Sequence, residues 1–487
     1  MPSRKASALL GILAFTLASA SAPPAEESRP ITAAVQPREF RYTFPAFGEV
    51  SVYRPTGAPK GVVLLLSDED GWTPAMETIA RALAAKDILV AGVSTSALMR
   101  AMETAKAGCN NPNYPLVDLA RDLQHRTYVE NYMKPVIVGY GSGATLTYAS
   151  IAQWPNGGYQ GAVSINPAPY LAGKKPWCAA PGFATHRVSK PVQGWRFAPN
   201  KTVTIPWTVM QPRSGEKIDS KLLLGFVSSV PKASLIELAE NETVKEPLHQ
   251  LGLRTAAVVQ ALLPAPIPAT LPGQNPIPDM PITLVQAAAG STSGMMAIAY
   301  SGDGGWVGLD RDLAAQIAAA GIPVVGVDSL SYFWSARTPQ GAGRDLSHLI
   351  KAFSERWNKP RVLLIGYSFG ADALPYIVDN MDADARAKIA GISLLGLSAT
   401  ADFQFHLTSW LDLSSSDSLP TIPAITRLKG LSLRCVRGDQ ETDSACPSIP
   451  PGLAQQYVVP GGHHFDRNAP LLARIVLGQR KPGTVTR

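Results

Sequence analysis

A serine in the second half of the chain stands in a setting that could make it a nucleophile. Residues 366–370 (Gly-Tyr-Ser-Phe-Gly) have the pattern G-x-S-x-G. They follow an apolar run, 362–365, that predicts a strand, and they precede a predicted helix over 371–379. A sharp turn between strand and helix needs glycines because the neighbouring backbone is close, and it exposes the serine hydroxyl at the edge of the sheet. Ser368 could therefore attack the carbonyl carbon of an ester or a peptide.

The glycine-rich segment 301–305 (Ser-Gly-Asp-Gly-Gly) could complete such a site. Attack on a carbonyl leaves negative charge on its oxygen, and backbone N–H groups must face that charge. One N–H is expected from Phe369, directly after the serine, and the other from the turn after an earlier strand. The apolar run 295–300 predicts that strand, so the second donor is expected to be Asp303 or Gly302.

Two adjacent histidines are candidates for the base that the serine needs. In enzymes whose serine lies in a strand–turn–helix unit of this kind, the nucleophile, the acid and the histidine follow one another along the chain in that order. Residues 461–465 (Gly-Gly-His-His-Phe) come after the apolar residues 457–459. We predict that His463, next to the two glycines, is the base, with His464 as the second choice.

Three carboxylates compete for the role of the acid, which holds the imidazole tautomer and stabilises the imidazolium. They are expected after the apolar run 431–436, where residues 438–443 are Gly-Asp-Gln-Glu-Thr-Asp. We favour Asp443, then Glu441, then Asp439.

The four cysteines fall as one pair in each half, Cys109 with Cys178 and Cys435 with Cys446. Their spacing is unlike that of a zinc site. In an oxidising compartment we expect two disulfides, the second of which would clamp the loop of the candidate acids. We predict no metal, nucleotide or flavin cofactor.

The N-terminal residues predict export. Arg4 and Lys5 precede the apolar run 6–17, and the small residues 18–20 follow it. This is the pattern of a secretory signal peptide, predicted over residues 1–22, and the run is shorter than the ~20 residues that a membrane span needs.

A proline-rich segment divides the rest of the chain into two similar domains. Residues 263–281 contain seven prolines and predict an extended linker between a domain over 38–262 and a second over 282–487. In the second, strands alternate with helices, which predicts a parallel sheet covered on both faces. We therefore expect two tandem α/β-hydrolase-like domains. The matching segments are 65–72 with 299–306, 88–93 with 322–327, and 138–144 with 365–371.

The first half lacks the catalytic pattern and is predicted to be a degenerate copy. Gly141 stands where the second half has Ser368, and Ser142 lies one residue further along. Residues 68–70 (Asp-Glu-Asp) replace the glycine-rich turn and would place negative charge where an oxyanion forms.

The charge pattern argues against nucleic acid as a partner. The formal net charge is +7, from 44 basic and 37 acidic residues. The basic residues are spread out, and no stretch interleaves them with aromatic residues as nucleic-acid grooves require. A mildly basic surface suits an anionic membrane at least as well.

At these motifs the second half resembles the VirJ/AcvB family of bacterial virulence-associated α/β-hydrolases. The two-domain layout with a signal peptide is similar to the longer, AcvB-type members. The segments that carry the resemblance are 300–306 (Tyr-Ser-Gly-Asp-Gly-Gly-Trp), 328–334 (Asp-Ser-Leu-Ser-Tyr-Phe-Trp) with 337–339 (Arg-Thr-Pro), 366–372 (Gly-Tyr-Ser-Phe-Gly-Ala-Asp) and 461–466 (Gly-Gly-His-His-Phe-Asp).

The resemblance implies a periplasmic hydrolase of aminoacyl-phosphatidylglycerol, with Ser368 as nucleophile and His463 or His464 as base. The enzyme would release lysine or alanine at an anionic membrane surface. The ammonium groups of this substrate call for nearby carboxylates, for which Asp328 and Asp372 are candidates. The alternatives are a broader esterase or peptidase, and a non-catalytic binding or scaffolding protein with partners in the envelope.

Overall fold

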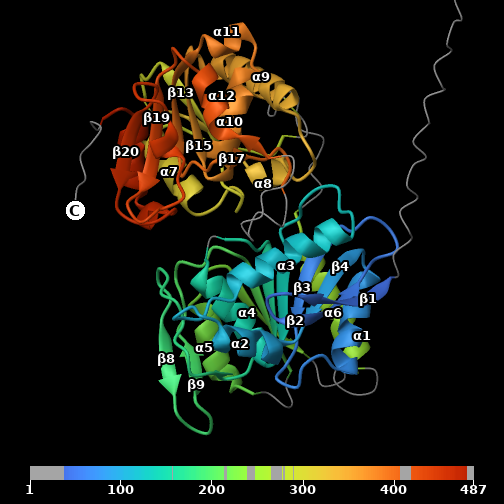
Figure 1. Ribbon diagram of the computed structural model, residues 1–487. Helices are drawn as coiled ribbons and strands as arrows, with labels where there is room; N and C mark the ends of the chain where they lie inside the picture. Colours follow the sequence, from blue (N-terminus) through green and yellow to red (C-terminus); the bar gives the residue numbers. More distant parts are fainter. Residues whose placement is uncertain are drawn as a thin grey trace, which may run out of the picture. The chain divides into compact units, whose positions relative to one another are not determined.

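The computed structural model describes residues 38–155, 157–212, 217–238, 247–264, 277, 280–288, 290–405 and 418–479. The predicted signal peptide over 1–22 and most of the predicted linker over 263–281 lie outside these ranges. Each half is a sheet with helices on both faces (Figure 1).

The first half is built on an eight-stranded sheet in the order β1-β2-β4-β3-β5-β6-β10-β11. β1, β2 and β4 pair antiparallel, and the remaining neighbours pair parallel. Because successive side chains of a strand point to opposite faces, Leu64 and Leu65 of β3 enter different cores. α3 and α4 cover the first of these faces, and α1 and α6 cover the second. The strands are β1 (Glu39–Phe44), β2 (Gly48–Tyr53), β3 (Gly61–Leu66), β4 (Ile88–Val93), β5 (Val136–Tyr140), β6 (Gly161–Ile165), β10 (Trp207–Pro212) and β11 (Ala233–Leu238), with a small sheet of β7 (Leu171–Ala172), β8 (Thr185–Val188) and β9 (Gly194–Phe197). The helices are α1 (Pro74–Ala84), α2 (Thr95–Thr104), α3 (Asn113–Arg126), α4 (Ser142–Gln153), α5 (Ser220–Ser228) and α6 (Pro247–Leu262).

The second half has a seven-stranded sheet in the order β12-β14-β13-β15-β16-β19-β20, in which only β12 is antiparallel. Leu364 of β15 faces the core under α9 and α10, and Leu363 faces the core under α7 and α13. The strands are β12 (Ile282–Val285), β13 (Met295–Tyr300), β14 (Val324–Val327), β15 (Arg361–Tyr367), β16 (Ile389–Leu395), β19 (Leu433–Gly438) and β20 (Gln455–Val459), with a short pair of β17 (Thr400–Ala401) and β18 (Leu419–Pro420). The helices are α7 (Leu309–Ala319), α8 (Ser329–Tyr332), α9 (Pro339–Trp357), α10 (Phe369–Asp379), α11 (Ala383–Arg386), α12 (Thr421–Arg427) and α13 (Ala469–Val476), and 3-10 turns lie at η3 (Cys446–Ser448) and η4 (Phe465–Arg467).

The two sheets share one topology. From β2 to β11, the first sheet has the same succession of strands and the same single antiparallel neighbour as the second sheet from β12 to β20. β1 is the strand that the first half adds. The predicted fold class, two tandem α/β-hydrolase-like domains, is confirmed.

The predicted Cys109–Cys178 and Cys435–Cys446 disulfides are both present. They agree with an oxidising compartment outside the cytoplasm. Within the described ranges, no helix combines the length and the apolar character needed to cross a membrane.

Candidate active site

Ser368 lies at the sharp turn between β15 and α10. Its backbone has a φ of 51° and a ψ of −122°, a conformation that costs a residue other than glycine about 1–3 kcal/mol. The flanking glycines let the chain fold this tightly. A Cβ at Gly366 would lie 2.4 Å from the carbonyl oxygen of Gly370, and a Cβ at Gly370 would lie 2.4 Å from that of Tyr300. The turn presents the serine hydroxyl at the carboxyl end of β15.

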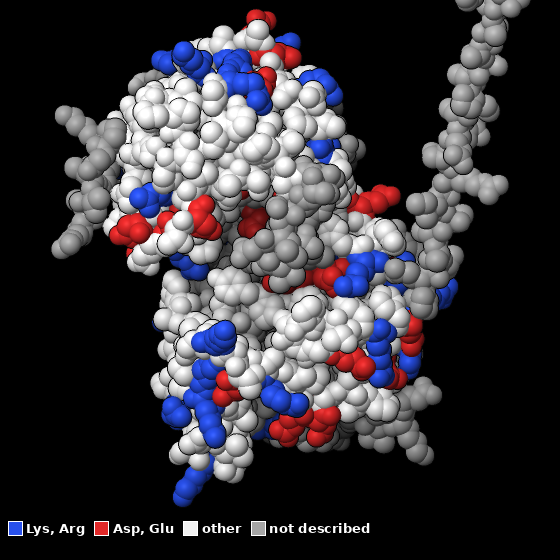
Figure 2. Space-filling model, viewed as in Figure 1, with Lys and Arg blue, Asp and Glu red and all other residues white. Residues whose placement is uncertain are grey.

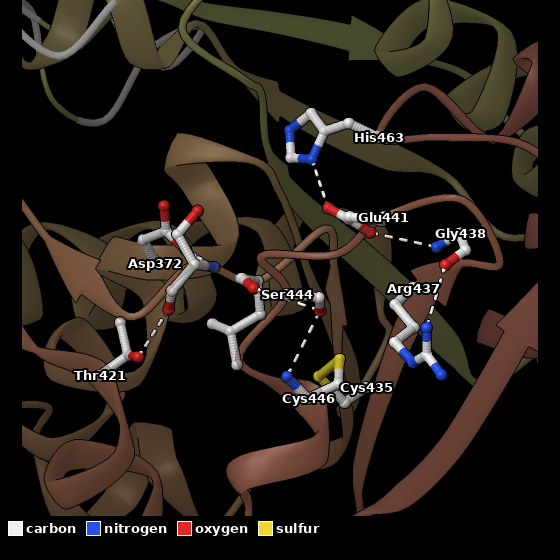
Figure 3. Close-up of a disulfide and its surroundings, with 11 residues drawn as sticks. Asp372, Thr421, Cys435, Arg437, Gly438, Glu441, Ser444, Cys446 and His463 are labelled. Atoms are coloured by element: carbon white, nitrogen blue, oxygen red, sulfur yellow. Dashed lines mark hydrogen bonds and ion pairs between the residues drawn. A yellow bond between two sulfur atoms is a disulfide. The ribbon is translucent and has the colours of Figure 1, made fainter. Parts of the chain in front are cut away.

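Three side chains from three separate loops form a hydrogen-bonded chain that begins at Ser368. The Nε2 atom of His463, from the loop after β20, lies 2.8 Å from the serine Oγ. Its Nδ1 lies 2.6 Å from an oxygen of Glu441, from the loop after β19. The other oxygen of Glu441 accepts a hydrogen bond from the backbone N–H of Gly438 at 3.1 Å (Figure 3). The geometry is that of a nucleophile, a base and an acid.

The prediction that Asp443 is the acid is wrong in this structure, because Glu441 occupies that position. β19 ends at Gly438, and the N–H of Glu441 donates back to the Gly438 carbonyl at 3.3 Å. This tight turn folds Glu441, which is 8% exposed, towards the imidazole. Asp443 lies two residues further on and is exposed. Asp439 accepts a hydrogen bond from the N–H of Gly461 at 2.9 Å and so fastens the histidine loop.

The two histidines have different partners. The pKa of His463 is raised, chiefly by its hydrogen bond with Glu441. His464, the second choice for the base, places its Nδ1 2.6 Å from the hydroxyl of Tyr367. Desolvation and the neighbouring His463 lower the pKa of His464. His463 is therefore the histidine that contacts both Ser368 and a carboxylate.

Of the two candidates for the second oxyanion donor, Asp303 fits better than Gly302. The Gly302 N–H already donates a hydrogen bond to the buried carboxyl of Asp310. Burial raises the pKa of Asp310, and this hydrogen bond acts in the opposite direction. Gly302 itself lies against the nucleophile, since a Cβ there would be 3.3 Å from the Cβ of Ser368.

The first half contains the same turn in a blocked form. Gly141, the counterpart of Ser368, has a φ of 59° and a ψ of −118°. An oxygen of Asp68 accepts hydrogen bonds from the N–H groups of Ser142 and Glu69, both at 2.8 Å. In the matched segments these two N–H groups correspond to those of Phe369 and Asp303. The other Asp68 oxygen lies 2.6 Å from the ammonium of Lys217. A carboxylate of the protein itself thus occupies the position of an oxyanion.

The carboxylates that the sequence suggests for a substrate ammonium have internal partners. Asp328 caps α8, where it accepts a hydrogen bond from the N–H of Ser331 at 3.0 Å. Asp372, in the first turn of α10, is 9% exposed and accepts from the N–H of Ser398 at 2.7 Å. Burial raises the pKa of Asp372 well above its ordinary value. These contacts favour structural roles for both residues.

Two residues that the sequence did not single out support the site. Asp310 holds the turn at Gly302, and the Tyr367 hydroxyl contacts His464. Asp310 follows the glycine-rich segment by a few residues, but no sequence pattern indicates that it folds back onto it. In the part of the chain that the structure describes, no group of three or more His, Cys, Asp or Glu side chains could hold a metal ion.

The parallel sheet, the serine turn and the Ser–His–Glu chain define the second half as an α/β-hydrolase domain. Residues 294–482 match the family described as bacterial virulence protein (VirJ). The resemblance predicted from the motifs is confirmed over this segment, which contains all of them. No curated protein matches the chain.

Several solved hydrolase structures resemble about half of the chain at low similarity. An esterase domain from a Rhodothermus marinus protein is 10% identical, with 46% of this chain and 97% of that chain covered and a TM-score of 0.30. A dienelactone hydrolase from Anabaena variabilis is 11% identical, with coverages of 47% and 100% and a TM-score of 0.32. An α/β serine hydrolase without a lid from Xanthomonas campestris is 18% identical, with coverages of 47% and 95% and a TM-score of 0.30. The order and the directions of the strands, rather than these similarities, define the fold.

Proposed function

We propose that the protein is a periplasmic serine esterase that hydrolyses the aminoacyl ester of lysyl- or alanyl-phosphatidylglycerol. The products would be the free amino acid and phosphatidylglycerol. The observation that carries the reaction class is the hydrogen-bonded chain from Ser368 through His463 to Glu441. The lipid substrate is inferred from the motifs shared with the VirJ/AcvB family.

The geometry gives each group a step in the reaction. His463 Nε2 takes the proton of Ser368 as Oγ attacks the ester carbonyl, and Glu441 stabilises the imidazolium that forms. The N–H groups of Phe369 and Asp303 bind the oxyanion. The intermediate collapses, the glycerol oxygen leaves with the proton from His463, and the amino acid stays on Ser368 as an ester. Water, deprotonated by the same histidine, then releases it.

The location and the partner are also part of the proposal. The two disulfides and the predicted signal peptide support the periplasm. The excess of basic over acidic residues supports peripheral contact with an anionic membrane that contains the substrate. On the face seen in Figure 2, Lys and Arg form several small groups rather than one continuous patch, which agrees with weak, reversible contact.

A binding or scaffolding role suits the first half alone. Its oxyanion position is filled by Asp68, and it has glycine in place of the nucleophile. Such a domain could bind an envelope protein. The second half keeps the serine, the base and the acid, so a purely non-catalytic protein is the weaker alternative.

The test measures amino acid released from vesicles of lysyl- or alanyl-phosphatidylglycerol by the purified protein, beside its Ser368→Ala variant. We expect release by the wild type and none by the variant. A folded protein that reacts with a fluorophosphonate at Ser368 but releases no amino acid would be a broader esterase. No release and no labelling would favour the scaffold.

A further inference from the structure

Several carboxyl groups lie around the serine turn in the second half. Asp303 is partly buried and forms no ion pair with any described residue of the second half, and Asp443 is exposed. Four others have an internal hydrogen bond: Glu441 on His463, Asp310 on the Gly302 N–H, Asp372 on the Ser398 N–H and Asp328 on the Ser331 N–H.

The Asp303 carboxylate lies close to the place of reaction. It adds to the effect of Glu441 in raising the pKa of His463. The residue before it, Gly302, is in contact with Ser368, as its 3.3 Å approach to the serine Cβ indicates. The N–H of Asp303 corresponds to the one that binds a carboxylate oxygen in the first half. The backbone of residue 303 therefore lies at the oxyanion position, and its side chain begins there.

A negatively charged group in this position discriminates between neutral esters and esters that carry an ammonium group. It opposes the hydrolysis of a neutral ester, because it repels the negative charge that develops on the carbonyl oxygen. It attracts a substrate that carries an ammonium group on the carbon next to the carbonyl. The repulsion and the attraction act together to separate the two kinds of ester.

We propose that the Asp303 carboxylate binds the α-ammonium of an aminoacyl ester and makes the enzyme selective for esters of free amino acids. The inference rests on the proposed esterase function and names the feature of the substrate that is recognised. In Asp303, three carbon atoms separate the backbone nitrogen from the carboxylate oxygens. One residue can thus bind the carbonyl oxygen and the ammonium of the same aminoacyl group.

The test compares the p-nitrophenyl esters of alanine and of N-acetylalanine, which differ in the charge of the amino group. We expect the full-length wild type to prefer the free-amine ester. Asp303→Asn should lower kcat/KM for this ester at least ~10-fold relative to kcat/KM for the N-acetyl ester, because a neutral amide neither attracts the ammonium nor repels the oxyanion. Asp443→Asn is the control: it removes one charge from an exposed site nearby and should preserve the preference for the free-amine ester. Ser368→Ala supplies the background rate.

A parallel loss on both esters would assign Asp303 to the structure of the turn and overturn the inference. An unchanged ratio in Asp303→Asn, or a wild type without preference, would also overturn it. The lipid assay separates this result from the proposed function. Amino acid released from vesicles by both wild type and Asp303→Asn at equal rates rejects only the inference. An Asp303-dependent preference without release from lipid rejects only the lipid substrate.

Discussion

The hydrogen bond between Glu441 and His463 controls the charge of the imidazole. Glu441 raises the pKa of His463 most, and Asp303 and Asp443 raise it further, whereas burial acts in the opposite direction. The base must be neutral to accept the proton of Ser368. Activity should therefore rise with pH through the pKa of His463.

Replacing Glu441 tests whether its carboxylate sets the pKa of His463 and stabilises the imidazolium. Glu441→Gln keeps the shape of the side chain but removes its charge, so it no longer stabilises the imidazolium. We expect kcat for the ester to fall by about 10³–10⁴-fold. Because the largest cause of the raised pKa is lost, the midpoint of the remaining activity should move to lower pH. A pH profile of kcat on p-nitrophenyl alanine measures both effects.

Asp443→Asn is the matched control, because Asp443 is the residue that the sequence favoured. Its carboxylate is exposed, and the variant should retain kcat within about threefold, as expected for a surface charge. A large loss in Asp443→Asn together with an active Glu441→Gln would reverse the assignment of the acid.

At the scale of elements, the strand–turn–helix units could be predicted and the contacts between loops could not. Apolar runs and the glycine pattern predict β13, β15 and the serine turn, because each depends on residues that are adjacent in the sequence. Helix α9 begins at Pro339 under its Thr338 cap, although Gly341 and Gly343 in its first turns weaken the helical pattern of the sequence. The identity of the acid depends on the path of the loop after β19. That path brings Glu441 into contact with His463, which lies 22 residues further along the chain.

A substitution in the turn after β13 tests whether a carboxylate at this position blocks catalysis. Gly302→Asp places in the second half the residue that blocks the first half. Its carboxylate should bind the N–H groups of Phe369 and Asp303 as Asp68 binds those of Ser142 and Glu69. We expect kcat to fall at least ~10³-fold, since loss of one such donor costs about 10²–10³-fold.

Gly302→Ala separates this blockage from simple crowding. The added Cβ would lie 3.3 Å from the Cβ of Ser368, which a small shift relieves, so a milder loss is expected. Initial rates on p-nitrophenyl acetate, a neutral ester, compare the two variants. Equal losses in both would mean that steric contact, rather than the carboxylate, blocks the turn.

At the scale of the whole molecule, one topology serves two purposes. The second half has Gly302, without a side chain, at the position of Asp68, whereas the first half fills the oxyanion position with Asp68 and balances the charge with Lys217. Burial tends to raise the pKa of Asp68, but Lys217 and the N–H groups of Ser142 and Glu69 outweigh burial, and the pKa is lowered. In the first half this arrangement should therefore contribute to stability rather than to catalysis.

Asp68→Asn tests that division of roles. A carboxylate whose pKa is lowered by folding stabilises the protein above its unfolded pKa of about 3.9, and this contribution disappears as the pH falls through the folded value. The variant should therefore lose about 2 kcal/mol of stability at pH 7 and progressively less towards pH 3. Denaturant unfolding of both proteins at each pH measures the difference, and ester hydrolysis by the second half should stay unchanged. A variant with normal stability and impaired hydrolysis would instead place Asp68 in the function of the catalytic domain.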